Sequence, residues 1–185
     1  STPQPTLTPA TPAEAGPKYG GVLKAVLTQD VEPWELWRQS GAEALDLEGL
    51  WHEQLIDYYD GPPGCQLTPR QPSLATSWKW LDDVTVQFKL RQGVKFPRVA
   101  PMNGREFTAD DVVYTVEKGW PNALLIAAPV KEHLKTVTAI DKYTVNIGLH
   151  RPYSPFVDRV PGEKRAFIIG PEMYGGRDTI SRPEE

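Results

Sequence analysis

Residues 76–90 read TSWKWLDDVTVQFKL and carry the most regular pattern in the chain. From residue 84 to residue 91, hydrophobic and polar side chains alternate strictly. A period of two places successive side chains on opposite faces of a strand, so that one face is buried and the other is solvated. The Asp82-Asp83 pair supplies a turn before this strand. The stretch therefore predicts a β-hairpin with Phe88 on its buried face.

A second hairpin and a helix are predicted downstream. Residues 136–140 and 143–149 form the two arms of this hairpin, on both sides of an Asp141-Lys142 turn. Between the hairpins, Thr108 and Asp111 stand three residues apart, which is the spacing of a helix-capping box. The carboxylate also suits the positive end of the helix dipole. Valines at helical spacing follow, and Gly119 is expected to end the helix.

Shorter elements complete a mixed arrangement of strands and helices. This mixture favours an α+β fold over a wholly parallel sheet. Five further elements are expected from hydrophobic spacing and turn residues. They are a buried strand at 22–27, a helix at 42–58 that the turn at 61–64 ends, the start of a helix at 151–157, a short strand at 166–169 and a helical turn at 171–174.

Composition excludes several classes of protein. The chain has 185 residues, with 20 Lys and Arg against 24 Asp and Glu, and a net charge of −4. It lacks the basic excess that neutralises phosphates, so no nucleic-acid partner is expected. No apolar run approaches the roughly 20 residues that cross a bilayer. The single cysteine, Cys65, forms no internal disulfide and no cysteine-rich zinc module, and its role stays open.

Residues 1–17 are predicted to form a tether rather than part of the fold. Pro and Thr dominate this stretch, and Leu7 is its only sizeable apolar side chain. Such a segment buries too little surface to offset its chain entropy and favours extended, solvated conformations. Two interpretations stay open: a disordered terminus, or a stalk that holds a domain away from a surface, as in bacterial lipoproteins. The domain itself is assigned to residues 18–185.

Catalytic and metal-binding patterns are missing from the sequence. His52, His133 and His150 do not stand at metal-ligand spacing, so a structural or surface role is expected for each. There is no nucleophile elbow and no phosphate-binding glycine loop. The acid pairs at 82–83 and 110–111 are explained by turn formation and helix capping. The sequence therefore predicts neither an enzyme, nor a cofactor, nor a metal site.

Five of the six tryptophans divide into two groups. Trp51, Trp78 and Trp80 lie on predicted helix or strand faces, where core packing is expected. Trp34 and Trp37 follow the first predicted strand in a loop region. Loop aromatics can anchor ligands, so these two side chains are either binding anchors or ordinary packing residues.

A longer stretch carries a family resemblance. Residues 72–96 read PSLATSWKWLDDVTVQFKLRQGVKF and resemble the characteristic sequence of the family 5 extracellular solute-binding proteins, the oligopeptide and dipeptide receptors of ABC importers. The resemblance continues in the same order through FTADDVVYT at 107–115, VTAIDKYTV at 137–145 and RPYSPF at 151–156. LWHEQL at 50–55 occupies the place of a family helix. The resemblance implies the N-terminal part of a two-lobed, class II periplasmic-binding-protein-like fold.

The chain departs from the family pattern in its loops and its length. Residues 97–106 form a longer connection than usual, with an Asn103-Gly104 turn, and Gln54 replaces a customary glycine. Members of the family are much longer than this chain. The resemblance covers the first lobe with its inserted subdomain and leaves the second lobe missing, so we expect a fragment or a natural truncation.

The resemblance implies a receptor that binds without catalysis. It would capture peptides or similar small solutes and present them to an ABC permease, at the periplasmic or extracellular face of the cytoplasmic membrane, with a lipid anchor as an open question. By position, the ligand-binding candidates are Thr28, Gln29, Asp30, Trp34, Ser40, Gly41, Ala42 and Glu43. Alone, this chain is expected to bind peptides poorly.

A second class of function stays open. Half of a solute-binding fold could serve as an interaction module that docks on another subunit. A coding region that continues into a second lobe would favour the receptor, whereas a true stop and an apolar surface buried against a partner would favour the module.

Overall fold

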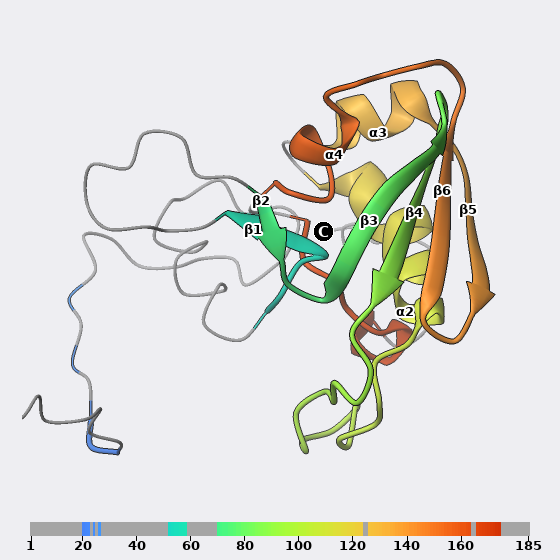
Figure 1. Cartoon of the computed structure of the whole chain (residues 1–185). Helices are drawn as coiled ribbons and strands as arrows, with labels where there is room; N and C mark the ends of the chain where they lie inside the picture. Colours follow the sequence, from blue (N-terminus) through green and yellow to red (C-terminus); the bar gives the residue numbers. More distant parts are fainter. Residues whose placement is uncertain are drawn as a thin grey trace, which may run out of the picture.

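Two β-hairpins, both predicted from their alternating sequences, join into one four-stranded antiparallel sheet (Figure 1). A computed structural model describes residues 20–22, 24, 26, 52–58, 70–123, 126–163 and 166–174. The sheet has the order β3-β4-β6-β5. Its strands are β3 (Ala75–Asp82), β4 (Thr85–Leu90), β5 (Leu134–Asp141) and β6 (Thr144–Leu149).

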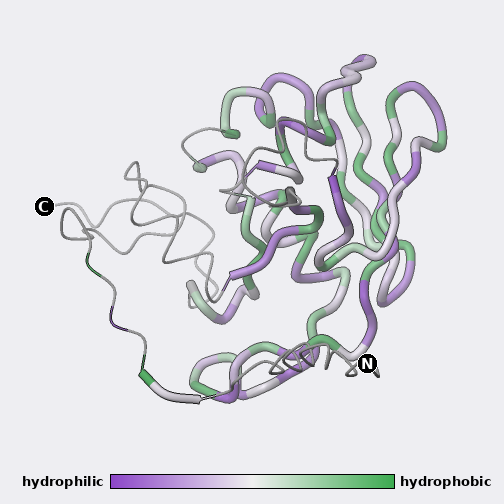
Figure 2. Tube along the Cα trace, turned by 60° about the vertical axis from the view of Figure 1, so that its left-hand side comes forward, coloured by the Kyte–Doolittle hydropathy of each residue, from purple (hydrophilic) through white to green (hydrophobic). Residues whose placement is uncertain are grey.

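The strand register confirms the predicted buried face. Phe88 of β4 lies opposite Val145 of β6, and Val86 lies opposite Ile147. All four side chains are fully buried. The other face carries polar neighbours, where the Gln87 side-chain amide donates a hydrogen bond to Asn146 Oδ1 at 3.0 Å. Figure 2 shows hydrophobic and hydrophilic residues in turn along these strands.

Helical segments cover the buried face of the sheet (Figure 1). The first begins as α2 (Ala109–Tyr114), widens into a π-helical turn, η1 (Thr115–Gly119), and ends as a 3-10 turn, η2 (Trp120–Asn122). A second helix, α3 (Ala127–His133), leads directly into β5. The predicted capping box is present, and the Thr108 backbone N–H donates to Asp111 Oδ2 at 2.9 Å.

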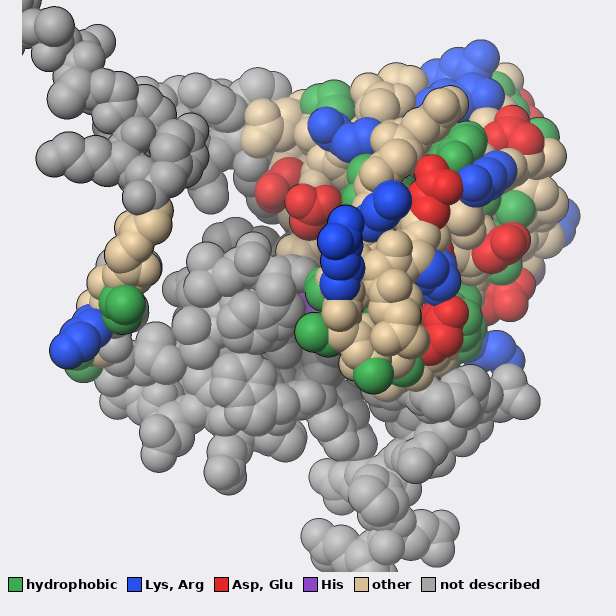
Figure 3. Space-filling view, turned by 90° about the horizontal axis from the view of Figure 1, so that it is seen from below, with side chains coloured by type: hydrophobic (Ala, Val, Ile, Leu, Met, Phe, Trp, Pro, Cys, Tyr) green, Lys and Arg blue, Asp and Glu red, His purple; other side chains and the backbone are tan. Residues whose placement is uncertain are grey.

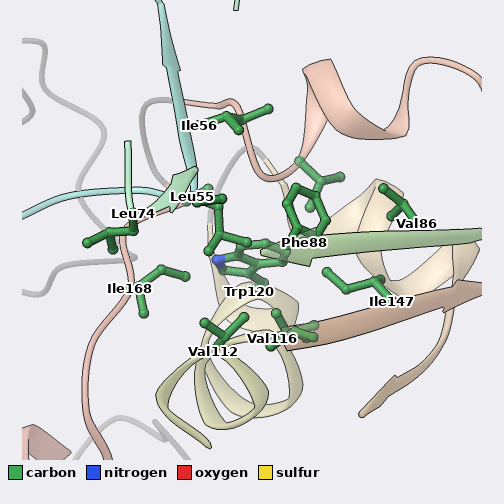
Figure 4. Close-up of a cluster of buried hydrophobic side chains, with 14 of the residues drawn as sticks. Leu55, Ile56, Leu74, Val86, Phe88, Val112, Val116, Trp120, Ile147 and Ile168 are labelled. Carbon is green, nitrogen blue, oxygen red and sulfur yellow. The ribbon is translucent and has the colours of Figure 1, made fainter. Parts of the chain in front are cut away.

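Trp120 occupies the centre of the hydrophobic core. Its side chain has no exposed surface, although the sequence pattern did not mark it as a core residue. Figure 4 shows its ring between Val112 and Val116 of the helical segment and Phe88 of the sheet, with Leu55 close by. The core therefore joins the sheet, the helical layer and the segment that precedes the first described strand.

A small second sheet lies beside the edge strand β3 (Figure 1). It pairs β1 (Ile56–Tyr58) with β2 (Arg70–Pro72) in antiparallel fashion. The predicted helix start at 151–157 becomes α4 (Phe156–Arg159), and the predicted turn at 171–174 becomes a 3-10 helix, η3 (Pro171–Tyr174). Arg70 of β2 binds Asp158 of α4 through a 3.0 Å hydrogen bond, which ties the two elements together.

The expected helix at 42–58 is wrong where the structure describes it. Ile56–Tyr58 forms strand β1, and Gln54 makes an isolated bridge with Phe167. The backbone explains the change, because the Leu55 carbonyl accepts a hydrogen bond from Ala75 N–H at 2.8 Å. A long-range partner has overridden the local helical spacing. Residues 42–51 lie outside the described residues.

Two predicted strands are also corrected. Residues 166–169 are buried, but Phe167 contributes only the isolated bridge. The Ile169 N–H donates a hydrogen bond to the Thr115 hydroxyl oxygen at 3.1 Å, and the Thr115 hydroxyl donates one to the Ile169 carbonyl at 2.9 Å. A side chain thus replaces the ladder that a strand would need. The expected buried strand at 22–27 is wrong at its described valines, since Val22 and Val26 are 87% and 97% exposed and pair with no described strand.

The core assignment of the tryptophans holds for only one of the described pair. Trp78 packs against the core, but Trp80 is 38% exposed. Both residues belong to β3, which has a single neighbour in the four-stranded sheet, so its side chains are covered on one side only. Trp51 lies outside the described residues.

Replacing Phe88 with Asp should prevent cooperative folding. The change removes a fully buried ring and places a carboxylate in the core, at a cost of at least about 4 kcal/mol against a typical stability of about 5–15 kcal/mol. Thermal unfolding followed by circular dichroism measures the effect. Lys79→Asp, on the exposed face of the neighbouring strand, is the matched control and should keep a cooperative transition. An unchanged melting temperature for Phe88→Asp would contradict the face assignment.

Candidate functional site

The ligand-binding residues predicted from the sequence, from Thr28 to Glu43, lie outside the described residues, as do Trp37 and Cys65. The assignment of Thr28, Gln29, Asp30, Trp34, Ser40, Gly41, Ala42 and Glu43 therefore stays a prediction. The same holds for the proposed tether at 1–17.

The described residues contain a pocket of about 670 Å³ beside the long connection that the sequence singled out. Its largest wall is loop 94–107, defined as residues 94–107, which projects below the sheet in Figure 1. The remaining walls come from three separate segments. They supply His52 and Glu53 before β1, Leu74 between β2 and β3, and Ile168 and Met173 near the end of the described chain.

Loop 94–107 is a short hydrogen-bonded hairpin. The Phe107 N–H donates to the Val94 carbonyl at 2.9 Å, and the Phe96 N–H donates to the Arg105 carbonyl at 3.0 Å. The predicted turn is present, and Asn103 and Gly104 adopt positive φ angles of 50° and 73°. Asn and Gly are the residues that tolerate this left-handed region best. The pocket wall is thus held by its own backbone.

Arg105 fixes this wall to two other elements. Its guanidinium donates to Asp111 of α2 at 2.5 and 3.0 Å and to Glu172 of η3 at 2.6 Å through each of two nitrogens. It also lies 4.8 Å from the centroid of the Phe96 ring, a cation–π distance. The bonds to Arg105 lower the pKa of the Glu172 carboxyl. Asp111, chosen from the sequence as a cap, is therefore also a positioning group for the pocket.

Gly170 makes this close packing possible. A Cβ atom at this position would collide with the guanidinium of Arg105 and with the terminal methyl group of Met102. Both groups are ends of flexible side chains of loop 94–107, so a side chain at position 170 would require them to move.

A further ion pair holds the base of the loop to the sheet. Glu106 accepts hydrogen bonds from Lys142 and from the Tyr143 hydroxyl, both at 2.7 Å, and from the Gly93 N–H at 3.1 Å. These bonds, led by the one from Lys142, lower the pKa of Glu106 to about 2. Its carboxylate is charged at neutral pH, and the loop stays joined to the β5–β6 turn.

His52 brings a neutral imidazole to the pocket. Burial lowers the pKa of His52 to about 4, and its ring lies 5.6 Å from the ring of Phe167. His133 is buried and stacks on Tyr153 with 3.9 Å between ring centroids, whereas His150 is exposed. A structural or surface role was expected for each, and the buried His133 and the exposed His150 fit it. His52 lines a pocket that the sequence did not reveal.

The acid pairs behave as predicted. Asp82 Oδ1 accepts the Val84 N–H at 2.8 Å in the first hairpin turn, and Asp111 caps α2. Within the described ranges, no group of three His, Cys, Asp or Glu side chains could hold a metal ion. No helix in that part of the chain is long and apolar enough to cross a membrane. The pocket's lining, mostly aliphatic and aromatic, suits binding.

Comparison with known families gives a match over most of the described chain. Residues 70–169 match the family described as bacterial extracellular solute-binding proteins, family 5, middle part. The match begins at β2 and includes the whole four-stranded sheet, its helical layer and α4. No relative is found among the curated protein sequences.

Solved structures share the fold at low identity. One is the periplasmic binding protein DppA from Helicobacter pylori with the peptide STSA, with a TM-score of 0.62, 22% identity and coverage of 77% of this chain and 29% of that one. A second is a dipeptide-binding protein from Pseudoalteromonas sp. SM9913 with Met-Leu (TM-score 0.64, 22% identity, 77% and 30% coverage). A third is NikZ from Campylobacter jejuni with Ni(L-His) (0.61, 18%, 83% and 28%). This chain thus spans less than a third of each structure's length. The mixed α/β fold and its partial match to the periplasmic-binding-protein architecture are as the sequence predicted.

Replacing Asp111 with Asn should destabilise the protein by about 2 kcal/mol, because it weakens charge-assisted hydrogen bonds of a buried carboxylate. Asp110→Asn is the matched control in the same helical turn. Asp110 is exposed, so its replacement should change the free energy of unfolding by no more than about 0.5 kcal/mol. Urea unfolding at neutral pH measures both. Equal losses of stability in the two variants would show that the hydrogen bonds between Arg105 and Asp111 do not stabilise the protein.

The low pKa of His52 predicts a pH-dependent stability. The unfolded imidazole takes up a proton below about 6.5, whereas the folded one stays neutral down to about 4, so stability should fall as the pH falls through this window. His52→Phe should make the free energy of unfolding less dependent on pH between these values. Exposed His150→Asn is the control and should retain the parent's slope. A His52→Phe profile parallel to that of the parent would refute the assignment.

Proposed function

Because this chain belongs to the bacterial extracellular solute-binding proteins of family 5, we propose that it forms part of the substrate-binding component of an ABC importer. The component captures peptides or similar small solutes and delivers them to a membrane permease. The observation that supports this function is the continuous match over residues 70–169, whose strands and helices form one hydrophobic core.

The proposed ligand class rests on the structural neighbours and stays broad. Two of the three neighbours described above hold peptides and the third holds Ni(L-His). The ligand cleft of a solute-binding protein selects ligands through a few polar groups on an otherwise apolar surface. The residues from Thr28 to Glu43 are proposed as one wall of that cleft.

The proposed mechanism is capture without turnover. Binding shifts the receptor towards a closed form that the permease accepts, and no bond in the ligand is broken. The description of the family as extracellular supports a site of action outside the cytoplasm. We propose the periplasmic or extracellular face of the cytoplasmic membrane, with residues 1–17 as a tether and a lipid group as its anchor.

Deleting the gene should abolish uptake of peptides that its receptor captures. The measurement is uptake of isotope-labelled di- and tripeptides by the deletion strain, by the complemented strain and by the parent. Uptake of free leucine is the internal control, because it needs no peptide receptor. Unchanged uptake of all tested peptides and solutes, together with a stable partner protein that purifies with the chain, would contradict the receptor function and favour the interaction module.

A further inference from the structure

The pocket beside loop 94–107 carries one charge of each sign at positions fixed by the backbone. Lys95 lies in an isolated bridge with Glu106, and the Glu53 carbonyl accepts the Ile168 N–H at 2.9 Å. Both side chains are exposed and line the pocket. Among the described residues, neither side chain has a hydrogen-bond or ion-pair partner.

Two other charged groups of loop 94–107 are already engaged. Arg105 is shared between Asp111 and Glu172, and Glu106 is paired with Lys142. Figure 3, which views the molecule from below, shows basic and acidic side chains mixed on this face rather than gathered by sign. The ammonium of Lys95 and the carboxylate of Glu53 are therefore available to a ligand that carries both charges, and no strong field of one sign opposes it.

The interior of the pocket is apolar and adaptable. Leu74, Phe107 and Ile168 form buried parts of its lining, and Figure 4 shows Leu74 and Ile168 next to each other. The chain has only 2 methionines, Met102 and Met173, and both line this pocket. Methionine is flexible and polarizable, and it adapts to apolar groups of different shape.

The size of the pocket and its entrance fit a small molecule. Its volume of about 670 Å³ falls within the range of about 300–1,000 Å³ that is usual for ligand sites. Val99 and Met173 are 65% and 43% exposed at its rim, so apolar surface leads from solvent to the buried lining.

We propose that this pocket binds short zwitterionic peptides through one bulky hydrophobic side chain. The side chain enters between loop 94–107 and Ile168, the peptide carboxylate faces Lys95, and the peptide ammonium group faces Glu53. The inference rests on the proposed function, which brings peptides to this protein. It adds a site separate from the predicted residues Thr28 to Glu43.

Binding at this pocket alone is expected to be weak. A dipeptide makes few contacts there, and each exposed charge pair contributes little because solvent screens it. The expected dissociation constant is in the millimolar range, which corresponds to about −4 kcal/mol. This agrees with the expectation that the chain alone binds peptides poorly.

The 2 methionines make a direct test possible. The full 185-residue chain, labelled with carbon-13 in its methionine methyl groups, should give two resonances that both report on the pocket. Met102→Leu and Met173→Leu assign them. Leu-Leu should shift both resonances in a saturable way, whereas Gly-Gly at the same concentration should leave them unchanged. Acetyl-Leu-Leu-amide, which lacks both terminal charges, should bind about tenfold more weakly, or about 1.4 kcal/mol.

Two exposed substitutions form a matched pair. Val99→Asp, at the rim, should weaken Leu-Leu binding about tenfold, because a charge at the entrance opposes entry of an apolar group. Ile140→Asp, at a residue that is 54% exposed on β5 and outside the pocket, should leave binding unchanged. Both variants should retain the melting temperature of the parent, which shows that they are folded.

Three results would overturn the proposal. They are methyl resonances that do not move at about 20 mM Leu-Leu, equal binding by the two Asp variants, and equal binding of the capped and free peptides. The peptide-uptake experiment separates this failure from that of the proposed function. If the resonances do not move but uptake depends on the receptor, only the proposed peptide pocket is wrong. If the shifts are saturable but no uptake depends on the receptor, only the proposed transport role is wrong.

Discussion

The register between β4 and β6 is the constraint on which the rest of the structure depends. It places Phe88 opposite Val145 and turns both side chains towards the helical layer. A slip of one residue would move every core side chain of these strands to the polar face. The position of Trp120, the path of the helical segment and the placing of loop 94–107 at the end of the sheet all follow from this pairing.

Local patterns predicted the parts of the fold that local physics controls. The two hairpins and the start of α2 follow from period-two alternation, turn-forming aspartates and a capping box. Strand β1 could not be predicted, because Ile56–Tyr58 takes its conformation from a partner strand further along the chain, at Arg70–Pro72. The strand predicted at 166–169 is wrong for the same reason. The Thr115 hydroxyl makes the backbone hydrogen bonds that a neighbouring strand would have made.

The pocket was hidden from the sequence because four separate segments build it. Neither Glu53 nor Met173 stands near loop 94–107 in the chain, and no periodicity links them. The one available signal was the unusual length of the connection and its Asn103-Gly104 turn. The family, in contrast, could be recognised early, because its characteristic residues form a continuous run through the sheet and its helices.

Arg105 has a mechanical consequence. Its guanidinium holds α2 and η3 while its backbone belongs to loop 94–107. As long as both ion pairs persist, these three segments must move as one body. A displacement of Pro171–Tyr174, which lies at the end of the described chain, is then transmitted to the pocket wall without any change in the sheet. Arg105 thus couples the position of Pro171–Tyr174 to the shape of the pocket beside loop 94–107.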